Sequence, residues 1–116
     1  MKIDNGMHLL IDGDGNKKKL NDEVLIERFL ENLVVQLKMN KLNNVVIKRV
    51  ENEGDKDGIT GFVLLKESHA SIHTFPEKGF FHADVFSCKD FSKERVIEML
   101  KEEFLMKEFN EKVIRR

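Results

Sequence analysis

Apolar side chains recur along the chain in two different spacings. After Asn21 they return every three or four positions, which predicts an amphipathic helix over DEVLIERFLENLVVQLKM with Asn21 as its N-cap. The same spacing after Ser92, in KERVIEMLKEEF, predicts a second capped helix. Short β-branched or alternating segments between turn residues predict strands. The predicted strands are 7–12, 44–51, 59–66, 70–75, 80–88 and a final strand within 108–116.

The order of these elements indicates the fold class. It is β-α-β-β-β-β-α-β, and most consecutive strands are joined by short turns, which favours antiparallel pairing. We therefore expect one α+β domain over residues 1–116, a two-layer sandwich with both helices on one face of the sheet. The segments GDGNKKK and NEGDKDG are read as a solvated turn and a loop.

Charge and composition exclude several partners. The chain has 116 residues with 20 basic and 21 acidic side chains, so it offers no net field to nucleic acid or anionic lipid. The N-terminal apolar run is too short for a signal peptide or a membrane span, and we expect a cytoplasmic protein that acts on a small molecule. The single cysteine, Cys88, is either a packed thiol or a functional one.

Titratable side chains gather on one side of two successive strands. Side chains alternate along a strand, so His69, Ser71, His73 and Phe75 share one side, as do His82, Asp84, Phe86 and Cys88 on the next strand. This predicts a polar surface on which His73 and Cys88 could meet. A solvated face of an antiparallel sheet explains the same pattern without any function.

Two kinds of site are disfavoured by spacing and motif. His69 and His73 lie about 13 Å apart on a strand, too far to share one zinc ion with His82 and Cys88, and we expect no metal. A hydrolase triad of Ser68, His73 and Asp84 lacks the G-x-S-x-G motif around the serine.

One long segment resembles a known family. GITGFVLLKESHASIHTFPEKGFFHADVFSC, residues 58–88, is similar to the processing region of the small prokaryotic S-adenosylmethionine decarboxylase proenzymes. Their pattern is G-x-(S/T)-G, then ESH-x-(S/T)-IH-(T/S)-(W/F)-PE, then D-x-(F/Y)-(T/S)-C. The early GMHLL resembles their N-terminal G-x-H strand.

The resemblance implies self-cleavage at the Glu67–Ser68 bond, into a β chain of residues 1–67 and an α chain of residues 68–116. Ser68 would attack the carbonyl of Glu67 and end as a covalent pyruvoyl group, with Thr60 stabilising the oxyanion and His73 acting as the base of processing. No metal and no pyridoxal phosphate would then be required.

The resemblance also implies the reaction. The pyruvoyl group derived from Ser68 would hold the substrate as a Schiff base while CO₂ leaves, and Cys88 would protonate the product. Phe75 and Glu67 would contact the substrate. The activity implied is a decarboxylase of polyamine biosynthesis, acting as a homodimer of cleaved protomers that share the neighbourhood of the active site.

The chain departs from the family pattern in the residues that would bind the adenine of the substrate. Members that take S-adenosylmethionine carry a phenylalanine in F-x-P-x-G, which with a second aromatic clamps the adenine. Here Phe75 matches the second aromatic, but the first position is about Gly54, within an acidic stretch of Glu51, Glu53, Asp55 and Asp57. Phe80, Phe81 or a partner residue would have to replace the missing ring.

Three readings therefore stay open. The first interpretation is a decarboxylase whose substrate is S-adenosylmethionine. Arginine or ornithine is the alternative, because the acidic stretch would suit a cationic side chain if it is more than a solvated loop. A homologue that is not processed and acts as a regulatory or binding subunit is the alternative of another class.

Overall fold

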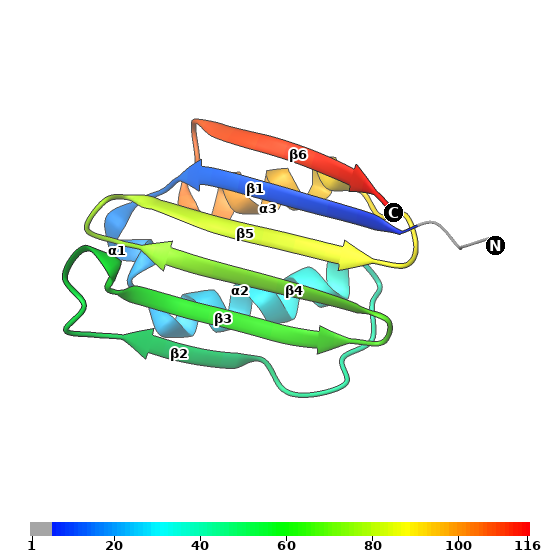
Figure 1. Cartoon of the computed structure of the whole chain (residues 1–116), viewed down its shortest axis with the longest axis horizontal. Coiled ribbons are helices and arrows are strands. Elements are labelled where there is room, and N and C mark those ends of the chain that lie inside the picture. Colours follow the sequence, from blue (N-terminus) through cyan, green and yellow to red (C-terminus); the bar gives the residue numbers. More distant parts are fainter. Residues whose placement is uncertain (1–5) are drawn as a thin grey trace.

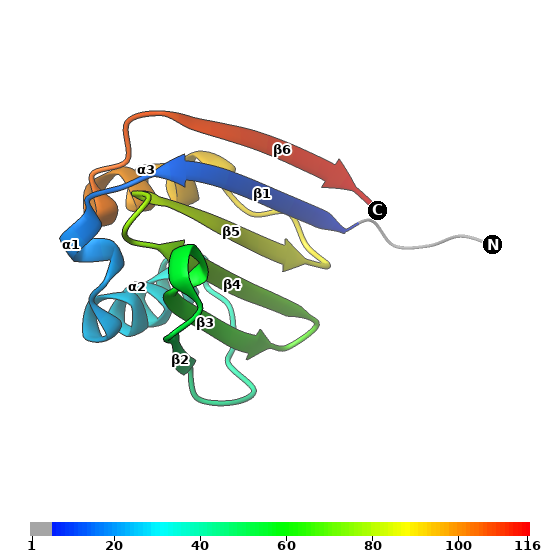
Figure 2. The same cartoon turned by 60° about the vertical axis from the view of Figure 1, so that its left-hand side comes forward.

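The computed structural model describes residues 6–116 as one antiparallel sheet with helices on one of its faces (Figures 1 and 2). This is the α+β two-layer sandwich that the sequence predicts. The strands are β1 (Met7–Asp14), β2 (Val46–Val50), β3 (Gly58–Leu65), β4 (Ser68–Phe75), β5 (Phe80–Ser87) and β6 (Phe109–Arg115). The helices are α1 (Lys17–Leu20), α2 (Glu23–Gln36) and α3 (Lys93–Phe104), with a 3₁₀ turn, η1, at Gly54–Lys56.

The six strands lie in the order β2-β3-β4-β5-β1-β6, and every neighbouring pair is antiparallel. Short hairpins join β3 to β4 and β4 to β5, because only a few residues separate these strands. As a result β4 and β5, which carry most of the motif, occupy the centre of the sheet.

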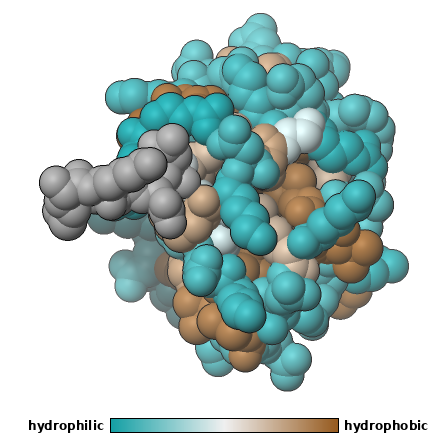
Figure 3. Space-filling view, turned by 90° about the vertical axis from the view of Figure 1, so that its right-hand side faces the viewer, coloured by the Kyte–Doolittle hydropathy of each residue, from teal (hydrophilic) through white to brown (hydrophobic). Residues whose placement is uncertain are grey.

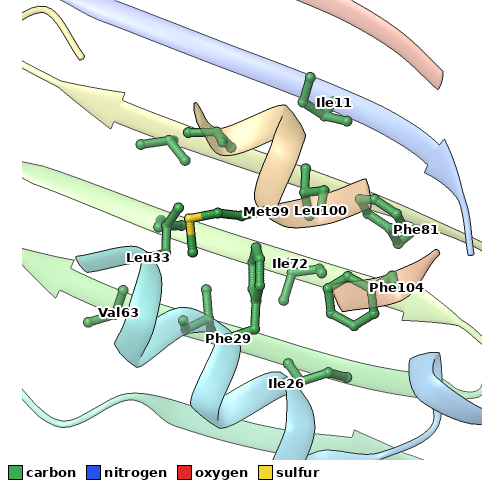
Figure 4. Close-up of a cluster of buried hydrophobic side chains, with 14 of the residues drawn as sticks. Ile11, Ile26, Phe29, Leu33, Val63, Ile72, Phe81, Met99, Leu100 and Phe104 are labelled. Atoms are coloured by element: carbon green, nitrogen blue, oxygen red, sulfur yellow. The ribbon is translucent and has the colours of Figure 1, made fainter. Parts of the chain in front are cut away.

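The hydrophobic core lies between the sheet and the two long helices (Figure 4). The ring of Phe29 on α2 meets that of Phe104 on α3 at 5.2 Å between centroids, and Phe104 also meets Phe81 on β5 at 5.7 Å. Ile11, Val63 and Ile72 complete this layer from the strands, each at most 1% exposed. Burial of such side chains contributes about 1.5–3 kcal/mol each, so the core fixes which face of the sheet is covered.

No helix among residues 6–116 covers the opposite face of the sheet, which we call the open face (Figure 2). Thr60, His69, His73, His82 and Asp84 point to it, because their neighbours in each strand are the core residues. The open face is not purely polar: four apolar side chains on it are 37–46% exposed, namely Val46, Phe62, Leu64 and Ile114.

The start of the chain differs from the prediction. The run after Gly15 is not a solvated turn but the short helix α1, capped by Asn16 and anchored by the fully buried Leu20. The N-cap of α2 is Asp22, which accepts from the backbone N–H of Leu25, and Asn21 instead accepts a hydrogen bond from Arg49. A single buried leucine after three lysines is too weak a pattern to predict a helix.

Two strand boundaries also differ from the prediction. β1 extends to Asp14, and β4 begins at Ser68, two residues earlier than predicted, because Ser68 pairs with both Leu65 and Ser87. Within residues 6–116 no helix is long and apolar enough to cross a membrane.

Candidate active site

The Glu67–Ser68 bond lies in a tight turn at one end of the sheet. Leu65 pairs directly with Ser68, so only Lys66 and Glu67 join β3 to β4. Glu67 has a φ of +64°, the left-handed region that side chains other than glycine rarely adopt. This conformation costs about 1–2 kcal/mol, and the backbone strain is therefore located at the residue that precedes Ser68.

Cys88 lies at the same end of the sheet. Ser68 pairs with Ser87 across β4 and β5, and Cys88 is the next residue, with an exposed free thiol. Figure 3 views the molecule at this end and shows hydrophobic surface between hydrophilic side chains. Glu67, Ser68 and Cys88 thus form one group, which we call the cleavage-end group.

Thr60 and His73 form a second group further along the sheet. They pair across β3 and β4, and 3.3 Å separates Thr60 Oγ1 from His73 Nδ1. His73 is five positions after Ser68 on β4, which is about 17 Å along an extended strand. Within one chain, therefore, neither Thr60 nor His73 reaches Ser68.

The expectation that His73 and Cys88 meet on one surface is consequently wrong for a single chain. His73 pairs with His82 on β5, and Cys88 follows six positions later, about 20 Å away. Alternation shows which side of a strand a residue occupies, but the position along the strand depends on the pairing register, which the sequence pattern did not reveal.

Two glycines of the motif position Thr60. A Cβ on Gly58 would lie 1.8 Å from the carbonyl oxygen of Thr74, and one on Gly61 would lie 2.9 Å from Leu30 of α2. Gly58 thus lets β3 approach the end of β4, and Gly61 lets α2 pack closely on the sheet. Both glycines of G-x-(S/T)-G are therefore explained by sterics, because a side chain at either position would clash with a neighbouring element.

An aromatic pair lies at the far end of β4 from Ser68. Phe75 and Phe80 pair across the β4–β5 hairpin, and their rings stack with centroids 4.7 Å apart. His82 packs its ring edge against both and hydrogen-bonds Asp12 at 2.6 Å. Phe81 has its side chain in the core, 0% exposed, so it is excluded as the replacement for the missing aromatic residue.

A third group lies between these two ends of the open face. The carboxylate of Asp84 on β5 hydrogen-bonds His8 of β1 at 2.7 Å and His69 of β4 at 3.0 Å, and its other oxygen accepts from Ser71. Burial alone would raise the pKa of Asp84, but the hydrogen bonds from Ser71, His8 and His69 outweigh it and hold the pKa below its ordinary value.

Sequence reasoning did not identify this group. The hydrolase triad considered for Asp84 is not assembled in the structure, because Asp84 contacts His69 and not His73. The zinc hypothesis was disfavoured by the spacing of His69 and His73 along one strand, and it did not include His8 or Asp84. The contribution of His8 from β1 becomes visible only when β1 is known to pair with β5.

Two carboxylates of the acidic stretch have local partners. Asp55 forms a salt bridge of 3.1 Å with Lys78, and the hydrogen bond and charge of Lys78 lower the pKa of Asp55. Asp57 accepts the backbone N–H of Glu53 at 2.7 Å, which closes the loop around η1. These contacts favour a structural role of the stretch over the binding of a cationic substrate.

Comparison with known proteins agrees with the motif. Residues 7–116 match the sequence profile of the family described as S-adenosylmethionine decarboxylase. A protein of Archaeoglobus fulgidus named S-adenosylmethionine decarboxylase proenzyme is 32% identical over 113 residues, covering 96% of each chain. A protein of Prochlorococcus marinus with the same name is 34% identical, covering 96% of this chain and 88% of its own.

A solved structure has the same fold. The crystal structure of the adenosylmethionine decarboxylase from Aquifex aeolicus superposes with a TM-score of 0.81 at 30% sequence identity. The match covers 97% of this chain and 91% of the other.

Proposed function

Because the chain belongs to the S-adenosylmethionine decarboxylase family, we propose that it is a self-processing, pyruvoyl-dependent decarboxylase of S-adenosylmethionine, serving polyamine biosynthesis. The observation that carries this proposal is the cleavage-end group: a serine directly after a strained Glu67, with a free thiol beside it. That arrangement offers a nucleophile, a bond whose cleavage releases strain, and a proton donor.

Processing begins when Ser68 Oγ attacks the carbonyl carbon of Glu67, and an N-to-O acyl shift converts the peptide bond to an ester. The hydroxyl of Thr60 donates to the oxyanion formed in this step. His73 then removes the α-proton of Ser68, and β-elimination releases Glu67 as the C-terminus of the β chain. Hydrolysis of the remaining dehydroalanine releases ammonia and leaves the pyruvoyl group at the head of the α chain.

Thr60 and His73 act on the Ser68 of a second copy. The separation of about 17 Å along β4 prevents them from acting within one chain. The open face supports pairing, because it exposes Val46, Phe62 and Leu64 between its polar groups. A twofold dimer formed through this face then contains two complete sites, each with a cleavage-end group from one copy and a Thr60–His73 pair from the other.

The residues around Ser68 fit the pyruvoyl group. Ser68 is half-buried at the first position of β4, so the new chain end remains held by the pairing of the strand. The group supplies an electron sink for the decarboxylation of an α-amino acid. Cys88, exposed beside Ser87, delivers the proton that replaces CO₂, and Glu67 borders the substrate from the new C-terminus.

The Phe75–Phe80 pair of the second copy, which lies on the same strands as that copy's His73, forms the surface that binds adenine. The two ring centroids are 4.7 Å apart, whereas a base inserted between two rings needs about 7 Å. The pair therefore presents one continuous aromatic surface, against which adenine stacks on one side. Phe80 in this way replaces the aromatic residue that is absent near Gly54.

The test is CO₂ release by purified protein whose cleavage has been verified by mass, with S-adenosylmethionine, arginine and ornithine supplied in parallel. We expect release from S-adenosylmethionine. Release from arginine or ornithine alone would instead assign the acidic stretch to substrate binding. A single uncleaved chain without activity on any of the three would favour the regulatory homologue.

A further inference from the structure

Three side chains from three neighbouring strands converge at the middle of the open face. His8 of β1 and His69 of β4 both pair with Phe86, from opposite sides of β5, and Asp84 lies two positions before Phe86. One ring nitrogen of His8, one of His69 and one Asp84 oxygen all lie within 4.8 Å of one another, and both Nε2 atoms hydrogen-bond the same Asp84 oxygen. Two imidazole nitrogens and one carboxylate oxygen are a ligand set that Zn²⁺ and similar divalent ions prefer.

Neighbouring side chains hold these three groups in place. Phe62 stacks on the ring of His69 at 5.5 Å, and the ring of His8 meets Phe86 edge-on at 5.6 Å. Ser71, itself buried, donates to the second oxygen of Asp84. A hydrogen bond to the free oxygen of a ligating carboxylate is a common support of metal sites, where it orients the ligand.

In a single chain the group is also open to solvent. The side chains of His8 and Asp84 are each 20% exposed and that of His69 is 31% exposed. An ion can therefore reach the three groups while the copies are apart, and in the dimer proposed above it lies between the two sheets. None of the three residues takes part in the processing or decarboxylation steps described above.

We propose that His8, His69 and Asp84 form a binding site for a divalent transition-metal ion such as Zn²⁺. The ion replaces the two hydrogen bonds that now join the imidazoles to Asp84. In the bound form each imidazole carries its hydrogen on Nδ1 and offers the Nε2 lone pair to the ion. With metal–ligand distances of about 2.0–2.2 Å, the rings move by several tenths of an ångström.

The experiment titrates tag-free, chelator-treated full chain with Zn²⁺ by calorimetry and with Co²⁺ by visible absorption. We expect one equivalent of ion per chain and Co²⁺ absorption bands of a low-symmetry site. His8→Ala and His69→Ala should each weaken binding at least about tenfold, and Ser71→Ala should weaken it about 10–100-fold through the orientation of Asp84.

His82→Ala is the matched control, because His82 lies on the same face and also hydrogen-bonds an aspartate, Asp12. It should bind the ion as the wild type does. If a histidine variant does not fold, as judged by circular dichroism, Asp84→Asn serves in its place, since it keeps the shape and weakens the ligand. Failure of the wild-type chain to bind in a saturable way, or equal loss in His82→Ala, would overturn the proposal.

Discussion

Thr60 and His73 face each other across β3 and β4 with 3.3 Å between hydroxyl oxygen and imidazole nitrogen, yet both lie far along the sheet from Ser68. The two halves of the proposed processing site are therefore separated within one chain. This relationship leads to the sharpest test of the mechanism, because it predicts complementation between two inactive variants.

Ser68→Ala and His73→Ala should each remain uncut when expressed alone. When they are co-expressed, the His73→Ala chain should be cleaved, since its Ser68 meets the intact His73 of the Ser68→Ala chain. Mass spectrometry of the mixture distinguishes the two chains, and the Ser68→Ala chain should keep its full mass. Mixed dimers that form but contain no cleaved chain would refute action between copies.

The identity of the nucleophile is tested by Ser68→Ala itself. This variant should stay one chain on a denaturing gel, because alanine at the first position of β4 has no hydroxyl to attack the carbonyl of Glu67. Ser92→Ala is the matched control: it removes the N-cap of α3 and should cost about 1 kcal/mol of stability while cleavage proceeds. Cleavage of Ser68→Ala between residues 67 and 68 would rule out the assignment.

Cys88→Ala separates processing from turnover. The variant should cleave normally, because the thiol has no part in the acyl shift, but kcat should fall about 10²–10⁴-fold as the proton donor is lost. The measurements are the fraction cleaved and the initial rate of CO₂ release, with the product checked by mass. Wild-type kcat with the normal product would remove Cys88 from the mechanism.

Phe80→Leu should raise KM for S-adenosylmethionine about fivefold, since it removes a stacking contribution of about 1 kcal/mol while keeping apolar volume. Phe80→Tyr keeps the ring and should leave KM near that of the wild type. An unchanged KM in the leucine variant would mean that Phe80 does not contribute to adenine binding.

Gly58→Ala should destabilise the protein by about 3 kcal/mol or more, because the new Cβ would lie 1.8 Å from the carbonyl oxygen of Thr74. Gly54→Ala provides the control, since Gly54 has a φ of +65° but no atom within 4 Å of the new Cβ. Its cost should be only the backbone strain, about 1 kcal/mol. Thermal unfolding of both variants measures the difference, and equal costs would contradict the steric role of Gly58.

Local patterns in the sequence were sufficient to predict the main elements and the family. The apolar spacing of α2 and α3 and the alternation in β4 and β5 reflect one-sided burial, which is a property of consecutive residues. The motif around Glu67 and Ser68 is also contiguous, so the bond proposed to be cleaved and Cys88 could be identified from the sequence. Their roles in processing and turnover remain predictions until the variants above are tested.

Only the tertiary structure decided how these residues are distributed in space. The register of β4 against β5 placed Cys88 beside Ser68, and the extension of β4 back to Ser68 placed His73 about 17 Å from that residue. The pairing of β1 with β5 brought His8 to Asp84 across 76 positions of the chain. Such contacts depend on which strands become neighbours, and that choice is made by the packing of the whole core rather than by any local pattern.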